Sequence, residues 1–279
     1  NFLVSRNDLK NIYDKKKSKT SMQFTNYFYP RIKKIINYLE EIKSTDKSNR
    51  KHLKDNISIP YVDLPKMNNN KYILEAIKYV EYHFKNNYGN SENFIFPIDH
   101  RGANKWLDHF IQNNLKFFGT YQDAIIQNES YLFHSILSSS INIGLLNPCF
   151  ILEQIKKTSS IKMNNIEAYT RQLIWREYQR YCYMFLSDIL ISKNFFKLNK
   201  RISKKWYDGT TEVYPVNETI KKAFDTGYLH HIERLMIIGN FMLLNKIKKE
   251  DGFKWFMEFA IDSYEWGMFQ NVYDMVFYS

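Results

Sequence analysis

Cysteine is scarce in this chain of 279 residues, which contains only Cys149 and Cys182. Neither cysteine belongs to a CxxC motif or to a cluster of cysteine and histidine, so a disulfide scaffold is excluded and no metal site is expected. The sequence also lacks a leader of basic and then apolar residues, which is typical of an intracellular, reduced protein.

Long apolar runs, glycine and proline are scarce as well. The longest nearly apolar run, from Leu235 to Leu244, is interrupted by Asn240 and is far shorter than the roughly 20 residues of a membrane helix. We therefore expect no membrane partner. Nine glycines and six prolines argue against an all-β sandwich and against glycine-rich phosphate loops. Helical structure is favoured.

Basic and aromatic residues are abundant. The chain has 40 basic and 29 acidic residues, which gives a net charge of +11, together with 21 Tyr and 21 Phe. A basic surface next to many flat rings favours nucleic acid or a nucleotide cofactor as a partner. A surplus of Lys, Asn and Ile is also what an A+T-rich genome encodes, so the charge alone leaves both explanations open.

The spacing of apolar residues predicts an all-α fold. Residues 24–39 have a period near 3.6 and predict one helix, whereas residues 43–69 are polar, contain two prolines and are typical of a linker. Residues 70–279 show further helical patterns and almost no strand alternation, and they predict one helical domain. The apolar positions that define these later helices are Ile73, Ile77, Val80, Phe84; Trp106, Phe110, Leu115; Tyr169, Leu173, Tyr181, Phe185; and Ile232, Leu235, Met236, Gly239, Met242, Leu243.

Two histidine-containing segments are candidate binding elements. Residues 134–140 (HSILSSS) join two apolar stretches, and hydroxyl and backbone N–H groups at the start of a helix can hold a diphosphate. A serine-rich helix cap is the alternative. The adjacent His230 and His231 point about 100° apart on a helix and so cannot share a metal. One of them could donate a proton to a bound ring, or both could be solvated or capping residues.

Two further segments combine rings with charges. In residues 172–178 (QLIWREY), Trp175 could line a pocket for a base, although tryptophan on an amphipathic helix is usually a core residue. If Asp262 meets Arg234, the two form a fixed ion pair that can hold a heteroaromatic ring by hydrogen bonds.

Taken together, these segments resemble one protein family. The resemblance rests on residues 118–124 (FGTYQDA), 132–146, the WREY residues 175–178, and residues 226–236 (TGYLHHIERLM) with GNF at 239–241. They are similar to the iron-sulfur bacterial cryptochromes and (6-4) photolyases, also called deoxyribodipyrimidine photolyase-related proteins. The resemblance runs from about residue 2 to the end of the chain.

The resemblance implies a flavoprotein that repairs DNA. It identifies residues 1–69 as the end of an α/β antenna domain and an interdomain linker, and residues 70–279 as a helical FAD-binding domain, truncated at its carboxyl end. The implied activity is light-driven repair of UV pyrimidine dimers, chiefly (6-4) photoproducts, which makes the chain a DNA photolyase-like lyase, located in the cytoplasm or at DNA. The implied partners are UV-damaged DNA and an upstream antenna-domain fragment.

The resemblance also assigns roles to residues. His231 would be the catalytic proton donor, with His230 behind it. Residues implied to bind FAD are Tyr121, His134, Ser135, Leu137, Ser138, Arg234 and Asp262. Residues implied to carry electrons to the flavin are Trp255 and Tyr207, and those implied to line the lesion cavity are Gln172, Trp175, Tyr264 and Met275.

Three departures from the family pattern weigh against full activity. Pro215 stands where the family has its first cluster cysteine, and the other three do not appear, so we expect no iron-sulfur cluster in this chain. Met268 replaces the carboxylate expected near flavin N5, and a thioether is a weak acceptor. One glycine is missing before Trp175, which shifts the helix register at Gln172. A cryptochrome-like or decayed flavoprotein without repair activity and a basic helical nucleic-acid-binding module without a cofactor are the alternatives.

Overall fold

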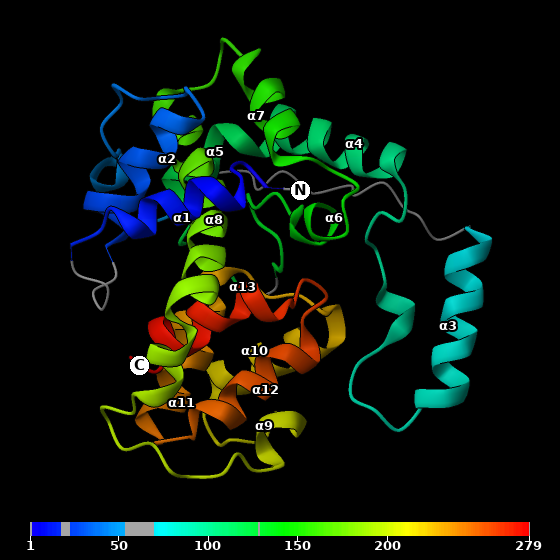
Figure 1. Cartoon of the computed structure of the whole chain (residues 1–279). Coiled ribbons are helices and arrows are strands. Elements are labelled where there is room, and N and C mark those ends of the chain that lie inside the picture. Colours follow the sequence, from blue (N-terminus) through cyan, green and yellow to red (C-terminus); the bar gives the residue numbers. More distant parts are fainter. Residues whose placement is uncertain (1, 18–22, 54–69, 128, 279) are drawn as a thin grey trace.

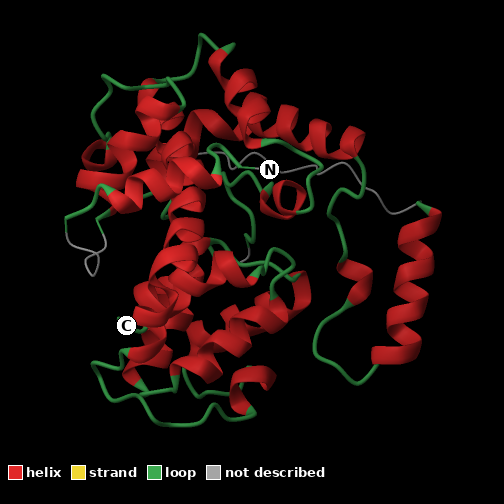
Figure 2. Cartoon of the chain, in the orientation of Figure 1, coloured by secondary structure: helices red, strands yellow, loops and turns green. Residues whose placement is uncertain are grey.

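The described part of the chain is almost entirely helical. The computed structural model describes residues 2–17, 23–53, 70–127 and 129–278 (Figure 1). Helices and loops account for these residues (Figure 2), apart from two isolated β-bridges, Ile126 with Glu129 and Lys200 with Ile247. The predicted all-α fold is confirmed. Within the described residues, no helix is both long enough and apolar enough to cross a membrane.

The first half of the fold surrounds the long helix α8 (Met163–Ser192). The elements that precede it are α1 (Arg6–Asp14), η1 (Phe24–Phe28), α2 (Tyr29–Ile35), η2 (Asp46–Ser48), α3 (Lys71–Phe84), η3 (Ser91–Asn93), α4 (His100–His109), η4 (Phe110–Asn114), α5 (Leu115–Tyr121), α6 (Ser138–Asn142) and α7 (Pro148–Lys156). The short elements η2 and η3 are 3₁₀-helices, and the other η elements are π-helical.

The second half packs around the end of α8. Its elements are α9 (Lys205–Asp208), α10 (Tyr214–Thr226), η5 (Glu233–Gly239), α11 (Asn240–Leu244), α12 (Lys249–Phe259), α13 (Glu265–Gln270) and η6 (Asn271–Val276). Helix α8 contains neither glycine nor proline and therefore continues through both halves, where it packs against α5 and then against α13.

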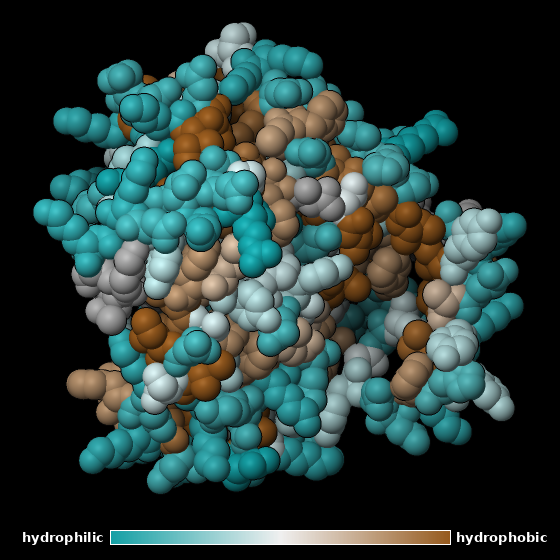
Figure 3. All heavy atoms as spheres, in the orientation of Figure 1, coloured by the Kyte–Doolittle hydropathy of each residue, from teal (hydrophilic) through white to brown (hydrophobic). Residues whose placement is uncertain are grey.

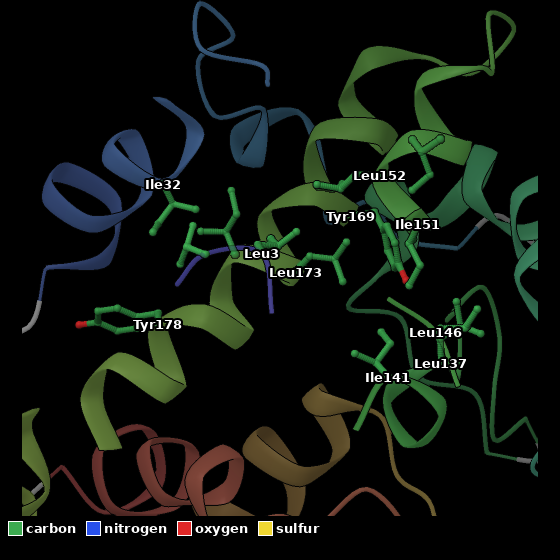
Figure 4. Close-up of a cluster of buried hydrophobic side chains, with 14 of the residues drawn as sticks. Leu3, Ile32, Leu137, Ile141, Leu146, Ile151, Leu152, Tyr169, Leu173 and Tyr178 are labelled. Carbon is green, nitrogen blue, oxygen red and sulfur yellow. The ribbon is translucent and has the colours of Figure 1, made fainter. Parts of the chain in front are cut away.

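Two main groups of buried apolar residues stabilise the two halves. Figure 4 shows part of the first group, in which Leu137 and Ile141 from α6 and its approach lie near Ile151 of α7 and Tyr169 of α8. The second group is formed by α9 to α13 and η6 and includes the fully buried Trp255. Burial of apolar area of this kind is the main favourable term in folding.

The amino-terminal segment belongs to the first group of buried residues. The backbone N–H of Leu3 donates to Glu177 Oε1 at 2.8 Å, and the hydroxyl of Tyr29 donates to Glu167 Oε1 at 2.7 Å. The helix predicted for residues 24–39 is shorter, because α2 ends at Ile35 and is followed by left-handed residues. Of the predicted linker, residues 54–69 lie outside the described residues.

Helix α3 stands apart from the body of the molecule (Figure 1). Its only buried residue is Ile73, although the predicted apolar face, with Ile77, Val80 and Phe84, is present. This face lines a groove of about 720 Å³, whose opposite wall includes Phe224 and the residues around Phe259. Figure 3 shows apolar side chains between α3 and the body.

Candidate cofactor site

Asp262 joins three segments that are far apart in the sequence. Its Oδ2 accepts a hydrogen bond from the hydroxyl of Ser138 at 2.8 Å, and its Oδ1 accepts one from Nη2 of Arg234 at 3.0 Å. Ser138 is the first residue of α6, Arg234 lies in η5, and Asp262 lies in the turn between α12 and α13. The side chains of Arg234 and Asp262 are only 13% and 14% exposed, so their attraction is weakly screened by solvent.

Two further groups fix the geometry of this cluster. Nε of Arg234 donates to the carbonyl of Leu229 at 2.6 Å, and the amide of Asn142 donates to the backbone carbonyl of Asp262 at 3.1 Å. Asn142 and Leu229 were not among the residues predicted from the sequence. Asn142 follows Ser138 by four residues and so lies on the same face of α6, a signal from which it could have been found. A backbone acceptor such as Leu229 leaves no signal in the sequence.

His134 and His230 lie against each other beside this cluster. Their rings are stacked, with centroids 4.7 Å apart and an angle of 12° between the planes. Burial lowers the pKa of His134 to about 4 and lowers the pKa of His230 well below its usual value. Nε2 of His134 and both ring nitrogens of His230 have no hydrogen-bond partner among the described atoms. The stack is therefore neutral near pH 7.

His231 has a different environment from its neighbour. Its side chain is exposed to solvent, whereas His230 is only 2% exposed. Partial desolvation of the ring, together with the positive charge of Arg234, lowers the pKa of His231 to about 4. The two histidines thus point in different directions, as expected for adjacent helix residues. His231 is accessible to a bound molecule, and His230 is a buried support.

The serine turn lies on the first group of buried residues. Ser135 forms a hydrogen bond with Tyr169, whose pKa burial raises to about 12. Leu137 is fully buried, so a ligand at this turn would meet its backbone rather than its side chain. Tyr121 packs on Phe133, with ring centroids 5.6 Å apart. The predicted diphosphate-binding residues are thus near one another, and α6 begins at Ser138, within the predicted turn.

A row of aromatic rings connects the two predicted electron carriers. Tyr207 is 6.0 Å from Phe224, and Phe224 is 5.8 Å from Trp255, measured between ring centroids. Trp255 is in turn 4.8 Å from Phe259, over which the guanidinium of Arg234 lies at 5.6 Å. The row therefore runs from half-buried Tyr207 to the ion pair. The two phenylalanines were not among the residues predicted from the sequence.

The four predicted lesion-cavity residues have separate environments. Gln172 donates to Gln122 Oε1 at 3.2 Å, next to Tyr121. Trp175 is half-buried and stacks on Phe24 with ring centroids 3.8 Å apart. Two others lie beyond these contacts: Tyr264 is exposed at the start of α13, and Met275 is half-buried in η6.

The residues that depart from the family pattern are well placed for structural roles. Met268 is 5% exposed and packs in the second group of buried residues. Pro215 lies in the first turn of α10, a position that tolerates proline because its missing N–H would have no partner in the helix. Cys149 and Cys182 are free, and the described residues contain no group of three or more His, Cys, Asp or Glu that could hold a metal ion.

The first 96 residues match a known family. Residues 1–96 match the family model described as deoxyribodipyrimidine photo-lyase-related protein. A (6-4) photolyase from Agrobacterium fabrum is 36% identical over 205 residues, which are 72% of this chain and 40% of that protein. Protein R853 of Acanthamoeba polyphaga mimivirus is 39% identical over 111 residues, which are 38% of this chain and 85% of that protein.

A solved structure has the same fold. The structure of a bacterial class III photolyase from Agrobacterium tumefaciens aligns with a TM-score of 0.55 at 24% sequence identity. The alignment covers 63% of this chain and 37% of that one. The chain therefore spans about 40% of the length of the Agrobacterium relatives it matches.

Proposed function

The chain belongs to the deoxyribodipyrimidine photolyase-related family, and from that membership we propose that it binds FAD and uses light to repair UV-induced pyrimidine dimers in DNA, preferably (6-4) photoproducts. The observation that carries this proposal is the convergence of Ser138, Arg234 and Asp262 from three distant segments. A net charge of +11 is suited to a nucleic-acid substrate. The partners that we propose for this function are UV-damaged DNA and an upstream antenna-domain fragment, and the proposed location is intracellular.

Unpaired polar atoms in α6 and in the His134–His230 stack leave room in this proposal for a nucleotide cofactor. Nε2 of His134 and the hydroxyls of Ser139 and Ser140 are buried without a partner among the described atoms, which is unfavourable unless a ligand or water pairs with them. In the proposal, Arg234 and Asp262 hold the flavin ring. The other contacts come from Ser135, Ser138, His134 and the backbone of Leu137 at the diphosphate, with Tyr121 nearby.

Bound FAD would supply the light absorption and the electron chemistry. The side chains of this chain would orient the reactants and hold a proton. His231 is neutral near pH 7 because its pKa is about 4, so it offers an N–H donor rather than a full positive charge. The His134–His230 stack supports the backbone from which His231 projects. Desolvation and, to a smaller extent, the positive charge of Arg234 lower the pKa of His231 and so favour its neutral form.

The row of rings between Tyr207 and Trp255 suits a supply of electrons to the flavin. The hydroxyl of Tyr207 donates to Glu258 Oε2 at 2.7 Å, and the indole N–H of Trp255 donates to the carbonyl of Trp206 at 2.8 Å. Both rings are therefore fixed in position. Gln172, Trp175, Tyr264 and Met275 remain the proposed lining for the lesion.

One observation favours a second candidate function. Met268 is buried among apolar residues and offers only a thioether where the family is expected to have a carboxylate. A cryptochrome-like flavoprotein that binds FAD without repairing DNA would tolerate this residue. The two candidates share the cofactor and differ in repair.

The visible spectrum of the purified chain tests the cofactor. We expect flavin absorption bands, and we expect Asp262→Ala to lower the FAD content several-fold because Arg234 loses its partner and Ser138 its acceptor. Asp251→Ala is the matched control. Asp251 also forms an ion pair, with Arg201 at a distance of 3.0 Å, but this pair does not belong to the cluster around Asp262. A folded chain that stays colourless after addition of FAD would refute both flavoprotein candidates.

Repair is tested with an oligonucleotide that carries one (6-4) lesion, illuminated with the reduced protein. We expect the parent to remove the lesion and His231→Ala to be at least a hundredfold slower, which is the lower end of the range of about 100- to 10,000-fold for a lost acid or base. His83→Ala on the exposed face of α3 is the control. Flavin binding without lesion removal would support the cryptochrome-like candidate, and equal rates for His231→Ala and the parent would exclude the proposed role of His231.

A further inference from the structure

The connection between α8 and α9 is strongly basic. Residues 193–205, here called the basic loop, contain six basic residues and no acidic residue, and all but the buried Leu198 and the half-buried Ile202 are exposed. The six are Lys193, Lys197, Lys200, Arg201, Lys204 and Lys205. In Figure 1 the loop lies at the lower edge of the molecule, where Figure 3 shows mostly hydrophilic side chains with apolar ones between them.

The basic loop is held in one shape by buried contacts. Asn194 and Leu198 exchange two hydrogen bonds, Asn194 Nδ2 to the carbonyl at 3.1 Å and the Leu198 N–H to Oδ1 at 2.8 Å. The Leu198 side chain is 4% exposed and anchors the loop in the second group of buried residues. The N–H of Ile202 donates to Asp251 Oδ2 at 2.9 Å. The exposed side chains are thus displayed by an ordered backbone.

A second basic segment lies against the loop. The N–H groups of Asn199 and Lys200 donate to the carbonyl of Lys246 at 3.1 and 2.9 Å, and the N–H of Lys248 donates to the carbonyl of Lys200 at 2.8 Å. Among the described residues, Lys197 and Lys200 have no carboxylate within ion-pair distance, whereas Arg201 is paired with Asp251. Two segments about fifty positions apart therefore add their charges on one surface.

Aromatic rings project from the same surface. Phe195 is 77% exposed and Phe196 is 44% exposed, with ring centroids 5.0 Å apart. The ring of Tyr278, 59% exposed, lies 5.7 Å from Phe196. Single exposed apolar residues are common, but rings that gather in one patch beside basic side chains are typical of an interaction surface.

We propose that the basic loop, with Lys246 and Lys248, binds single-stranded nucleic acid independently of base sequence. Lysine side chains attract the phosphates, and an exposed ring such as Phe195 stacks on a base, which is the combination that single-strand-binding surfaces use. A membrane surface fits less well, because binding at an interface relies on an amphipathic helix and the basic loop contains only the start of a four-residue helix.

This surface is separate from the candidate cofactor site. None of the side chains that meet at Asp262 belongs to the basic loop, and Figure 1 places the loop at the opposite end of the second half from α6. The proposal therefore goes beyond the proposed function, because it requires neither a flavin nor a lesion. It adds a second contact through which the chain holds an undamaged strand.

Fluorescence anisotropy with a labelled, undamaged oligothymidine tests the proposal on the full chain without added flavin. We expect Lys197→Glu/Lys200→Glu to weaken binding more than tenfold at low salt. If each lysine neutralises one phosphate, the slope of log affinity against log salt becomes shallower by about 1.4. Phe195→Ala should weaken binding about five- to a hundredfold with little change in that slope, because stacking is not electrostatic.

Lys34→Glu/Lys105→Glu is the control, since it changes the charge equally at exposed positions of α2 and α4. His83→Ala, on exposed α3 and outside both surfaces, should bind the oligonucleotide as the parent does. The proposal is wrong if both loop variants bind like the control. It is also wrong if Lys197→Glu/Lys200→Glu loses binding only to vesicles of phosphatidylcholine with phosphatidylserine.

Discussion

A single glycine lets the end of the chain pack against α12. A Cβ atom placed on Gly252 would lie 2.5 Å from Cζ and 2.6 Å from Cε2 of the fully buried Phe277. Alanine would gain up to about 1 kcal/mol of helix propensity, but forcing a methyl group into a packed core costs about 1–3 kcal/mol. We expect Gly252→Ala to lower the free energy of unfolding by about 1–2 kcal/mol, as measured by denaturant titration.

Gly267→Ala provides the comparison. It also lies in a helix, α13, but a Cβ there would find its nearest neighbour, Gln179 Oε1, at 3.9 Å. Without a clash, the propensity gain remains, and stability should be unchanged or slightly higher. Equal losses at both glycines would show that Phe277 moves away without cost and that the contact does not restrict the helix.

Residue chemistry also shows how much of the site was predictable. From the residues alone the pair of Arg234 and Asp262 was only conditional, and the family resemblance implied it; the structure contains the ion pair. The bond from Ser138 to Asp262 and the stacking of His134 on His230 could not be predicted, because they depend on how α6 packs against the second half. Roles in catalysis stay predictions.

The sequence predicted helices correctly where apolar residues repeat with helical spacing over several turns. The period at Tyr169, Leu173 and Tyr181 indicated α8, although the helix is longer than the pattern because it is buried on several faces. The period at Ile73 correctly indicated α3, but a period cannot show whether its apolar face meets a core or the open groove that it lines. The end of α2 at Ile35 was missed because left-handed residues, not glycine or proline, terminate it.

The end of α8 depends on a buried lysine from another helix. Nζ of Lys249 donates to the carbonyls of Leu190 at 3.1 Å and Ile191 at 2.6 Å, and also to that of Lys193. A cation at this position satisfies carbonyls that lack partners in the helix and interacts favourably with the helix dipole. We expect Lys249→Met to lower the free energy of unfolding by about 2–3 kcal/mol, since hydrogen bonds to charged groups are the stronger class.

Lys254→Met on the same helix is the control. Lys254 is 72% exposed and pairs with Glu258 at 3.5 Å, so its loss should change stability by less than about 1 kcal/mol. Circular dichroism during urea unfolding measures both variants. If Lys249→Met is as stable as Lys254→Met, the carbonyls at the end of α8 find other partners and the lysine is dispensable.

At the scale of the whole molecule, buried ionisable groups link stability to pH in opposite directions. Burial lowers the pKa of His134 to about 4, so the unfolded chain takes up a proton first as the pH falls, and stability decreases from about pH 6.5 towards pH 4. Burial raises the pKa of Glu177 to about 7, so its contribution increases as the pH falls through the same range. The slope of the free energy of unfolding against pH therefore contains both contributions, which have opposite signs.

The difference between parent and His134→Phe isolates the histidine contribution. Phenylalanine can keep the stack on His230 but cannot bind a proton, so we expect the variant to lose less stability than the parent between pH 6.5 and pH 5. The difference should be up to about 2 kcal/mol, from about 1.4 kcal/mol per pH unit. Urea unfolding at each pH measures it, with His83→Phe on exposed α3 as the control. Parallel curves for parent and His134→Phe would mean that His134 is protonated equally in the folded and unfolded chains, contrary to the burial of its Nε2 and its stacking on His230.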